Sequence, residues 1–490
     1  MLFHGIRLSQ CAGPPLETLE SDHRDLAVFI YEDAGPAGAK ILNTAAKVAL
    51  NAKLNEEGFK AGAKEICRVD LEILGKQRRV FAIGLGKKKA ATGETFRRAA
   101  GALVGAIRSK REKVAVLCAE QPQAVAEGLI LASYKYEEYK KGDADKLASA
   151  ALVVQDAGSR GAIEKACAKA SLYAEAVALA RDLVNRAPSD KTPASLAALA
   201  ETFKGLGVSV TVIDKDEAEK LGMGSFLGVA RGSAQPPVMV HMVYKPKGAK
   251  KKVALVGKGV TFDSGGLSLK PAQSMEEMKC DMAGAASVIS VFKVIARLKP
   301  KAEVHGIFAA TYNMPGPDAY KPGDVLKAMN GKTIEVWNTD AEGRLILADA
   351  LCLAAQQQPQ AIVDLATLTG AVVIALGSKV AGIMGNDRRL VAAVKSAGAR
   401  ANEDFCELPL VEDYKDSIKG NIAELLNISK VRGEAGSIIG GLFLQEFVGE
   451  TPWVHLDIAG TAFWSGDGPY GPKGGTGSPV RTLLEWLGGL

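Results

Sequence analysis

Short apolar runs alternate with alanine-rich helical patterns along most of this chain of 490 residues. Four runs of strand length occur in the first third of the chain, at residues 26–31, 80–85, 114–117 and 151–154. Five more occur in the rest, at residues 253–256, 304–310, 333–337, 361–365 and 454–458. Runs of this length separated by helices are typical of buried strands in a sheet flanked by helices. The alternation predicts an α/β protein with mixed or mostly parallel sheets.

The length of the chain predicts two domains, because a single hydrophobic core rarely grows this large. We expect a smaller N-terminal α/β domain over residues 1–162, a connecting helix over residues 163–187 and a larger catalytic domain over residues 188–490. The helix is expected to end before Pro188, because the residue before a proline disfavours the helical conformation. We find no phosphate-binding loop or catalytic cluster in the first domain, so we assign it a scaffold or assembly role.

Charged residues follow the predicted strand at residues 253–256. Lys258, Asp263 and Lys270 lie in glycine-rich sequence just beyond it, and Asp281 follows before a run of small residues. In open parallel sheets, ligands bind outside the carboxyl ends of the strands. Either aspartate alone could equally be a helix cap or a turn residue, and either lysine alone a surface group. Together these residues indicate a binding site.

A second cluster lies in the octapeptide Asn338-Thr-Asp-Ala-Glu-Gly-Arg-Leu345. If the backbone is extended there, Asp340, Glu342 and Arg344 project to the same side. An apolar stripe then predicts a helix over residues 345–357. Two carboxylates beside a permanent cation suit a metal ion next to developing negative charge. With the two upstream aspartates they make four carboxylates, which would balance the charge of two divalent cations.

Six stretches of the chain are similar to the successive signatures of one enzyme family. In chain order they read GKGVTFDSGGLSLKP, KCDMAGAASV, NMPGPDAYKPGDV, NTDAEGRL, DLATLTGA and WVHLDIAGTA. From residue 188 to residue 481 the chain thereby resembles the leucyl aminopeptidases (cytosol aminopeptidases), which are of the two-metal type. The first 160 residues resemble the family only in length and α/β character.

This resemblance implies a role for each candidate site residue. The implied ligands of two divalent ions are Lys258, Asp263, Asp281, Asp340 and Glu342. The implied catalytic cations are Lys270 and Arg344. The implied substrate contacts are Lys270, Met278, Asn338, Thr367, Leu368 and Gly370.

The resemblance also implies a mechanism, in which a water bridged between two metals attacks the N-terminal peptide bond. Lys258 must be neutral to bind a metal, whereas Lys270 stays protonated and stabilises the oxyanion. Arg344 stays charged and holds a bicarbonate ion, which moves the proton to the leaving amine. The free α-amine of the substrate binds one metal, so the enzyme is an exopeptidase, with a preference for leucine and other bulky apolar residues. Oxygen-rich ligation with one amine suits Mn²⁺ or Zn²⁺, and Co²⁺ would be tolerated.

Two other functions stay open at this stage. Four carboxylates alone would also allow a two-metal phosphoesterase, although a lysine ligand and the order of the motifs argue against it. The N-terminal domain could instead bind DNA or a partner, with or without catalysis. A net charge of +6 over this length makes no strong case for nucleic acid.

Composition bears on the compartment and the assembly. The seven cysteines are widely spaced with no C-x-x-C pair, so we expect free thiols in a reducing, cytoplasmic compartment. No stretch approaches 18 uninterrupted apolar residues, so we expect no membrane span. The family resemblance further implies a homohexamer, which nothing in composition or periodicity indicates.

Two positions depart from the usual sequence of the family. Residues 186–190 read Arg-Ala-Pro-Ser-Asp where members usually carry an Asn-Pro-Pro-Asn run, and we expect this to affect the domain hinge and not the metals. Tyr312 stands where members commonly carry glutamate. If that acid helps to order the site, its replacement would shift pH dependence or metal affinity. His305 and His455, on apolar strands, are expected to be core residues or residues that support the site from behind.

Overall fold

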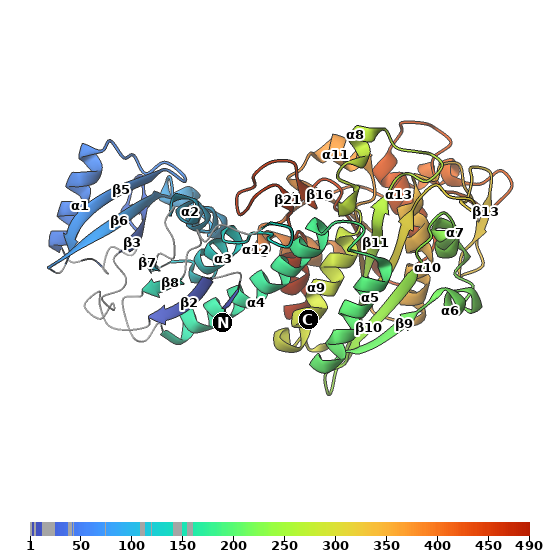
Figure 1. Cartoon of the computed structure of the whole chain (residues 1–490), viewed down its shortest axis with the longest axis horizontal. Helices are drawn as coiled ribbons and strands as arrows, with labels where there is room; N and C mark the ends of the chain where they lie inside the picture. The colour runs from blue at the N-terminus through green and yellow to red at the C-terminus, as the bar shows by residue number, and fades with distance from the viewer. Residues whose placement is uncertain are drawn as a thin grey trace. The chain divides into compact units, whose positions relative to one another are not determined.

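The structure is a computed structural model (Figure 1). It describes residues 2–3, 6–11, 25–37, 42, 44–73, 75–107, 113–118, 120–140, 149–153 and 160–490. The chain forms two compact units. Unit 1 comprises Met1–Glu175 and Gly466–Pro472, and unit 2 comprises Ala176–Ser465 and Lys473–Leu490. Helix α4 (Arg160–Asn185) contributes residues to both.

Unit 1, mostly blue in Figure 1, is built on an eight-stranded sheet in the order β1-β2-β8-β7-β3-β6-β5, with β4 paired to β3. Its inner strands are parallel, whereas β1 and β5 pair antiparallel at the edges. The strands are β1 (Leu2–Phe3), β2 (Ile6–Cys11), β3 (Asp25–Tyr31), β4 (Gly35–Pro36), β5 (Ile66–Ile73), β6 (Lys76–Gly84), β7 (Lys113–Leu117) and β8 (Ser149–Val153). The helices are α1 (Thr44–Glu56), η2 (Lys88–Ala90), α2 (Gly93–Ala106) and α3 (Pro122–Ala132).

Strand β3 shows why this sheet carries helices on both faces. Leu26 and Val28 belong to a core cluster with Leu50 of α1. The alternate residues Ala27 and Phe29 belong to a second cluster, which includes residues of α2 and α3. Because successive side chains of a strand point to opposite faces, a strand buried on both sides reads as one continuous apolar run.

Unit 2, green to red in Figure 1, is built on an eight-stranded sheet in the order β17-β16-β19-β15-β11-β12-β10-β9. Strands β19, β15, β11 and β12 are parallel in the middle, and antiparallel pairs flank them on both sides. The strands are β9 (Ser209–Ile213), β10 (Val238–Tyr244), β11 (Lys251–Asp263), β12 (Ala302–Asn313), β15 (Ala361–Ala366), β16 (Val380–Gly385), β17 (Asp404–Glu407) and β19 (Trp453–Asp457). The two units confirm the predicted α/β class with mixed sheets and a larger second unit.

Helices cover both the sheet and the loops of unit 2. After α4 they are α5 (Pro193–Glu201), η4 (Thr202–Leu206), α6 (Lys215–Lys220), α7 (Gly224–Ala230), α8 (Ala272–Met275), η5 (Met278–Cys280), α9 (Ala283–Leu298), α10 (Glu342–Gln356), α11 (Gly370–Leu376), α12 (Arg388–Ala401), η6 (Glu412–Ile418), α13 (Gly436–Gln445) and α14 (Val480–Gly488). Short strands form two small sheets, β13 (Val325–Lys327) with β14 (Thr333–Glu335) and β18 (Leu425–Leu426), and β20 (Phe463–Trp464) with β21 (Gly474–Gly475). The strand predicted at 333–337 is therefore shorter and lies outside the main sheet.

Strand β11 is longer than the sequence pattern predicts. We expected Lys258 and Asp263 beyond its end, but the strand runs from Lys251 to Asp263 and contains both. Its glycines stay in the strand because β12 pairs along its length and β15 along its first half. The glycines have a different purpose. A Cβ added to Gly257 would lie 2.6 Å from the backbone of Gly284. Because glycine has no Cβ, α9 can approach the sheet at this point.

The segment around Asp340 is not extended, so the condition for Asp340, Glu342 and Arg344 to project to the same side is not met. Helix α10 already begins at Glu342, and Asp340 lies in the turn before it. A carboxylate in the first turn is favourable because the helix dipole places positive partial charge there. Two residues along a helix are a rotation of roughly 200°, so Glu342 and Arg344 point to different sides of α10.

The cysteines and the helices bear on two further expectations. The six cysteines whose side chains are described are free thiols, and the side chain of Cys11 lies outside the described part. Within the described ranges, no helix combines the length and the apolar character needed to cross a membrane.

The pair His241 and His305 makes the stability of unit 2 depend on pH. His241 Nε2 lies 2.8 Å from His305 Nδ1, and His305 Nε2 lies 2.9 Å from Glu303 Oε1. Burial and the neighbouring His305 lower the pKa of His241 to about 4. The unfolded histidine titrates near pH 6.5, so between these values the unfolded chain binds a proton that the folded chain does not.

We therefore predict that the free energy of unfolding falls by about 1.5 kcal/mol between pH 6.5 and pH 5 through His241 alone. Denaturant unfolding of the wild type and of His241→Gln at both pH values isolates this contribution. The wild type should lose more stability than the variant, and equal losses would contradict the assignment.

Candidate metal centre

Lys258 stands at the centre of the site. It is buried within β11, and its Nζ lies 2.8 Å from Asp281 Oδ1 and 2.8 Å from Glu342 Oε1. Nζ also donates to the Thr367 carbonyl oxygen at 2.9 Å. These partners come from the turn before α9, the start of α10 and the residue that follows β15. Gly343 allows the close contact, since an added Cβ would lie 2.7 Å from Lys258 Nζ.

Lys270 bridges the other two carboxylates. Its Nζ lies 2.9 Å from Asp263 Oδ2 and 2.5 Å from Asp340 Oδ1. Two hydrogen bonds to the other oxygen, Asp263 Oδ1, fix the orientation of this carboxylate. The donors are the Gly265 amide and Asn313 Nδ2, both at 2.8 Å. Lys270 is partly exposed, whereas Asp263 is buried. The structure thus brings all four predicted carboxylates around two lysines.

The electrostatics of the cluster fit divalent cations. Oxygen atoms of Asp263, Asp340 and Glu342 lie within 4.8 Å of one another. Burial, followed by the charge of Asp263, raises the pKa of both Asp340 and Glu342, and burial raises the pKa of Asp281 to about 6. Asp281 Oδ2 is buried and has no hydrogen-bond partner among the described residues. Crowded, under-bonded carboxylates are the hard oxygen ligands that divalent ions require.

Lys258 fits the same interpretation. Burial would lower the pKa of its ammonium, but Asp281 and Glu342 outweigh this and raise the pKa above its ordinary value. The proton on Lys258 therefore supplies positive charge that the carboxylates need. Since an amine binds a metal only after it loses its proton, a divalent ion placed here would replace that charge.

Arg344 lies apart from the carboxylates, although it follows them closely in sequence. Its Nη1 donates to the Asn427 carbonyl oxygen at 2.8 Å, and its guanidinium lies 6.0 Å from the centre of the Phe443 ring. Nε is buried and has no hydrogen-bond partner in the described part of the chain. Burial lowers the pKa of Arg344 to about 10, so the guanidinium stays charged at neutral pH.

Several residues that hold the site escaped the sequence analysis. Thr339 Oγ1 donates to the Gly265 carbonyl oxygen at 2.6 Å, and Tyr320 donates to the Thr339 carbonyl oxygen at 2.6 Å. Asp457 accepts from the Leu368 amide at 3.2 Å. Asn427 accepts from the Trp337 amide at 2.8 Å. These contacts join segments far apart in the sequence, and the residue types alone gave no signal of them.

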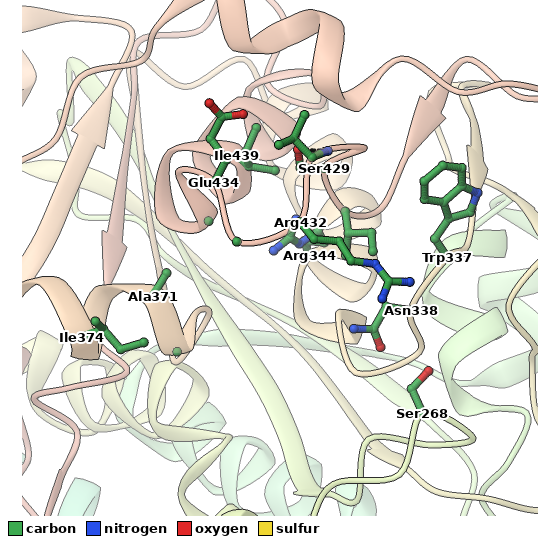
Figure 2. Close-up of a pocket in the computed structure, with 15 residues that line it drawn as sticks. Ser268, Trp337, Asn338, Arg344, Ala371, Ile374, Ser429, Arg432, Glu434 and Ile439 are labelled. Atoms are coloured by element: carbon green, nitrogen blue, oxygen red, sulfur yellow. Dashed lines mark hydrogen bonds between the residues drawn. The ribbon is translucent and has the colours of Figure 1, made fainter.

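A pocket of about 750 Å³ lies beside Arg344. Figure 2 shows Ala371 and Ile374 of α11 across from Trp337 and Asn338. The full lining is Ser268, Trp337, Asn338, Arg344, Gly370, Ala371, Ile374, Ile428, Ser429, Val431, Arg432, Gly433, Glu434, Gly436 and Ile439.

The predicted substrate contacts are divided between this pocket and the carboxylate cluster. Asn338 and Gly370 line the pocket. Thr367 instead faces the cluster, where its Oγ1 donates to Asp281 Oδ1 at 2.8 Å. Leu368 follows it, and Met278 begins the short helix η5 that precedes Asp281.

The two departures from the family pattern meet in the structure. Tyr312 donates a hydrogen bond to the Pro188 carbonyl oxygen at 2.7 Å. Pro188 lies within the divergent stretch 186–190, so that stretch is attached to β12, whose last residue Asn313 holds Asp263. The contacts of the stretch 186–190 therefore reach beyond the domain hinge, to the strand that ends beside Asp263. His305 and His455 are 4% and 0% exposed, which places both in the core.

An α/β unit whose parallel strands and adjoining helix starts gather buried carboxylates and lysines has the layout of a metal-dependent hydrolase. Comparison with protein families agrees with this class. Residues 178–484 match the cytosol aminopeptidase family, catalytic domain, and residues 27–143 match the N-terminal domain of the same family. The chain belongs to the cytosol aminopeptidase family, whose members are metal-dependent hydrolases that act at the N-terminus of peptides.

Relatives and solved structures cover nearly the whole chain. A probable cytosol aminopeptidase of Gloeothece citriformis is 42% identical over 482 residues, which are 94% of this chain and 96% of the relative. One of Aquifex aeolicus is 40% identical over 481 residues, which are 95% of each chain. The solved structure of the bottromycin maturation enzyme BotP in complex with Mn has a TM-score of 0.84 and 36% identity, covering 95% of this chain and 99% of that one.

We predict that divalent ions stabilise unit 2, because they relieve the repulsion within the carboxylate cluster. Protein stripped with a chelator should show a lower Tm by calorimetry, and Mn²⁺ at about 100 times its Kd should add about 2.7 kcal/mol. Asp281→Asn should show a smaller Mn²⁺-induced rise in Tm. A wild-type Tm that does not respond to Mn²⁺, Zn²⁺ or Co²⁺ would contradict the metal centre.

Proposed function

We propose that this enzyme is a leucyl aminopeptidase that removes leucine and other bulky apolar residues from the N-terminus of peptides. The observation that carries the proposal is the pairing of Lys258 and Lys270 with four crowded carboxylates near a pocket lined by apolar and charged side chains. Ile374, Val431 and Ile439 supply its apolar lining, which supports binding of a bulky apolar side chain.

The proposed ligands of two divalent ions, Mn²⁺ or Zn²⁺ with Co²⁺ also accepted, are Lys258, Asp263, Asp281, Asp340 and Glu342. The fit rests on hard oxygen donors, mutual repulsion among the carboxylates and the unpartnered oxygen of Asp281. When bound, two such metal ions would lower the pKa of a water that bridges them and would polarise the peptide carbonyl.

Lys270 is the proposed donor to the oxyanion. Two of its three N–H groups are directed at Asp263 and Asp340, which leaves one for a substrate oxygen. Burial opposes the charge of its ammonium, but Asp263 and Asp340 raise the pKa above its ordinary value, so Lys270 remains a cation. A fixed cation beside developing negative charge stabilises the transition state more than the ground state.

Arg344 is the proposed holder of a bicarbonate ion. Its guanidinium is planar, stays charged and lines the pocket, which suits bidentate pairing with a planar anion. A permanently charged guanidinium cannot accept the proton of the water nucleophile. The role of Arg344 is therefore to bind and orient.

The remaining contacts and the assembly are part of the same proposal. Met278, Asn338, Thr367, Leu368 and Gly370 would line the substrate cleft. Residues 1–162 would serve as a scaffold or assembly domain, 163–187 as the connecting helix and 188–490 as the catalytic domain. A cytoplasmic homohexamer is the proposed assembly.

The principal test is hydrolysis of leucine p-nitroanilide and of its N-acetyl counterpart by protein stripped with chelator and reloaded with Mn²⁺ or Zn²⁺. We expect metal-dependent cleavage of the free-amine substrate alone, because the α-amine is a proposed metal ligand. Cleavage of both substrates would remove that contact from the mechanism. Phosphatase activity without amidase activity would favour the phosphoesterase alternative.

Substitution of the two catalytic cations should have different signatures. Lys270→Ala should lower kcat by about 10²- to 10³-fold with a smaller change in KM, because it removes a transition-state contact. Arg344→Ala should lower kcat and also abolish any rate increase caused by added bicarbonate. Steady-state kinetics in bicarbonate-free buffer, with and without the ion, makes the comparison. A bicarbonate response retained by Arg344→Ala would contradict the role of Arg344.

A further inference from the structure

Lys191 is completely buried in unit 2, although a lysine ammonium normally remains in water. Within the described residues, no carboxylate forms an ion pair with it, and its two hydrogen bonds go to backbone oxygens. Burial lowers the pKa of Lys191 to about 7. A buried amine without a carboxylate partner is unfavourable for stability, so packing alone would be served better by an apolar side chain.

The two acceptors of Lys191 belong to different elements. Its Nζ donates to the Lys279 carbonyl oxygen at 2.6 Å and to the Val184 carbonyl oxygen at 3.2 Å. Val184 lies in the last turn of α4, where carbonyls lack partners within the helix and the helix dipole is negative. Lys279 lies in η5. Lys191 therefore joins the end of one helix to a short turn.

A second lysine reinforces this connection from the opposite direction. Lys279 Nζ donates to the carbonyl oxygen of Asn185, the final residue of α4, at 3.0 Å. The helix end thus accepts from both lysines, and the η5 backbone accepts from one of them. This exchange fixes η5 against α4 without any carboxylate.

The turn that Lys191 holds leads directly into Asp281. The Asp281 amide donates to the Met278 carbonyl oxygen of the same turn at 3.3 Å. The Asp281 carboxylate then meets Lys258 Nζ and Thr367 Oγ1, each at 2.8 Å. The backbone that carries this proposed metal ligand is therefore held from behind by Lys191.

We propose that Lys191 is a positioning residue for the Asp281 side of the metal centre, because it ties the turn before Asp281 to the end of α4. By holding the Lys279 carbonyl oxygen it keeps the Asp281 carboxylate directed at Lys258. The affinity of the centre for a divalent ion thus depends on a side chain that touches neither the ion nor the substrate. The inference rests on the proposed metal centre and concerns how the chain holds it.

The test measures metal binding and stability separately in the full chain. Lys191→Met keeps an unbranched side chain and removes the N–H donors. Titration calorimetry of chelator-stripped protein with Mn²⁺ should show one binding step weakened about 10-fold or more, the size of effect seen when a partner of a metal ligand is removed. The Tm of the stripped variant should be unchanged or higher, because a buried amine has been replaced by an apolar group.

Two further variants make the result specific. Lys191→Gln retains an N–H donor and should recover Mn²⁺ affinity to within about threefold of the wild type. Tyr312→Phe removes a hydrogen bond to the same chain segment without touching η5, and it should leave the affinity within about twofold.

Three results would overturn the inference. The first is equal Mn²⁺ affinity for Lys191→Met and the wild type. The second is a parallel loss of Tm and affinity in both Lys191 variants, which would assign the residue to folding alone. The third is an equal loss of affinity in Tyr312→Phe. A wild-type protein that binds no divalent ion would instead overturn the metal centre on which the inference rests.

Discussion

Four carboxylates are gathered around two lysine ammonium groups in unit 2, and three of the four are buried, so the rest of the unit must hold them together. Like charges repel more strongly as the surroundings become less polar, so such a cluster cannot persist on a flexible chain. β11 is paired on both sides, and α9 and α10 begin directly against it. Gly284 and Gly343 make these close contacts possible, because a side chain at either position would collide with β15 or with Lys258.

Much of this architecture could be predicted from local sequence patterns. A strand buried on both faces is a short apolar run, and β3, β7 and β15 lie within a residue or two of where such runs occur. Lys258, Asp281 and Glu342 were selected by residue type and motif, and the structure brings them into contact. Local patterns succeed where the environment of a residue is set mainly by its neighbours in sequence.

The boundaries and the supporting contacts could not be predicted in this way. The glycines of β11 suggested a loop, but pairing with β12 and β15 kept them in the strand. The spacing of Asp340, Glu342 and Arg344 would place them on one side of an extended chain, but α10 begins at Glu342, three residues before the start that its apolar stripe predicted. Asn427 and Asp457 acquire their roles only through contacts with distant segments, at Trp337 and Leu368.

The order in which these partners occur along the chain has a consequence for synthesis. Lys258 needs the carbonyl oxygen of Thr367, and Arg344 needs that of Asn427, which leaves the ribosome much later. Glu342 is the last of the four carboxylates, and strands β15, β16, β17 and β19 of the same sheet follow it in the chain. The complete sheet that holds the cluster can therefore form only after these strands have been made. We expect the four carboxylates to form a metal site late in synthesis.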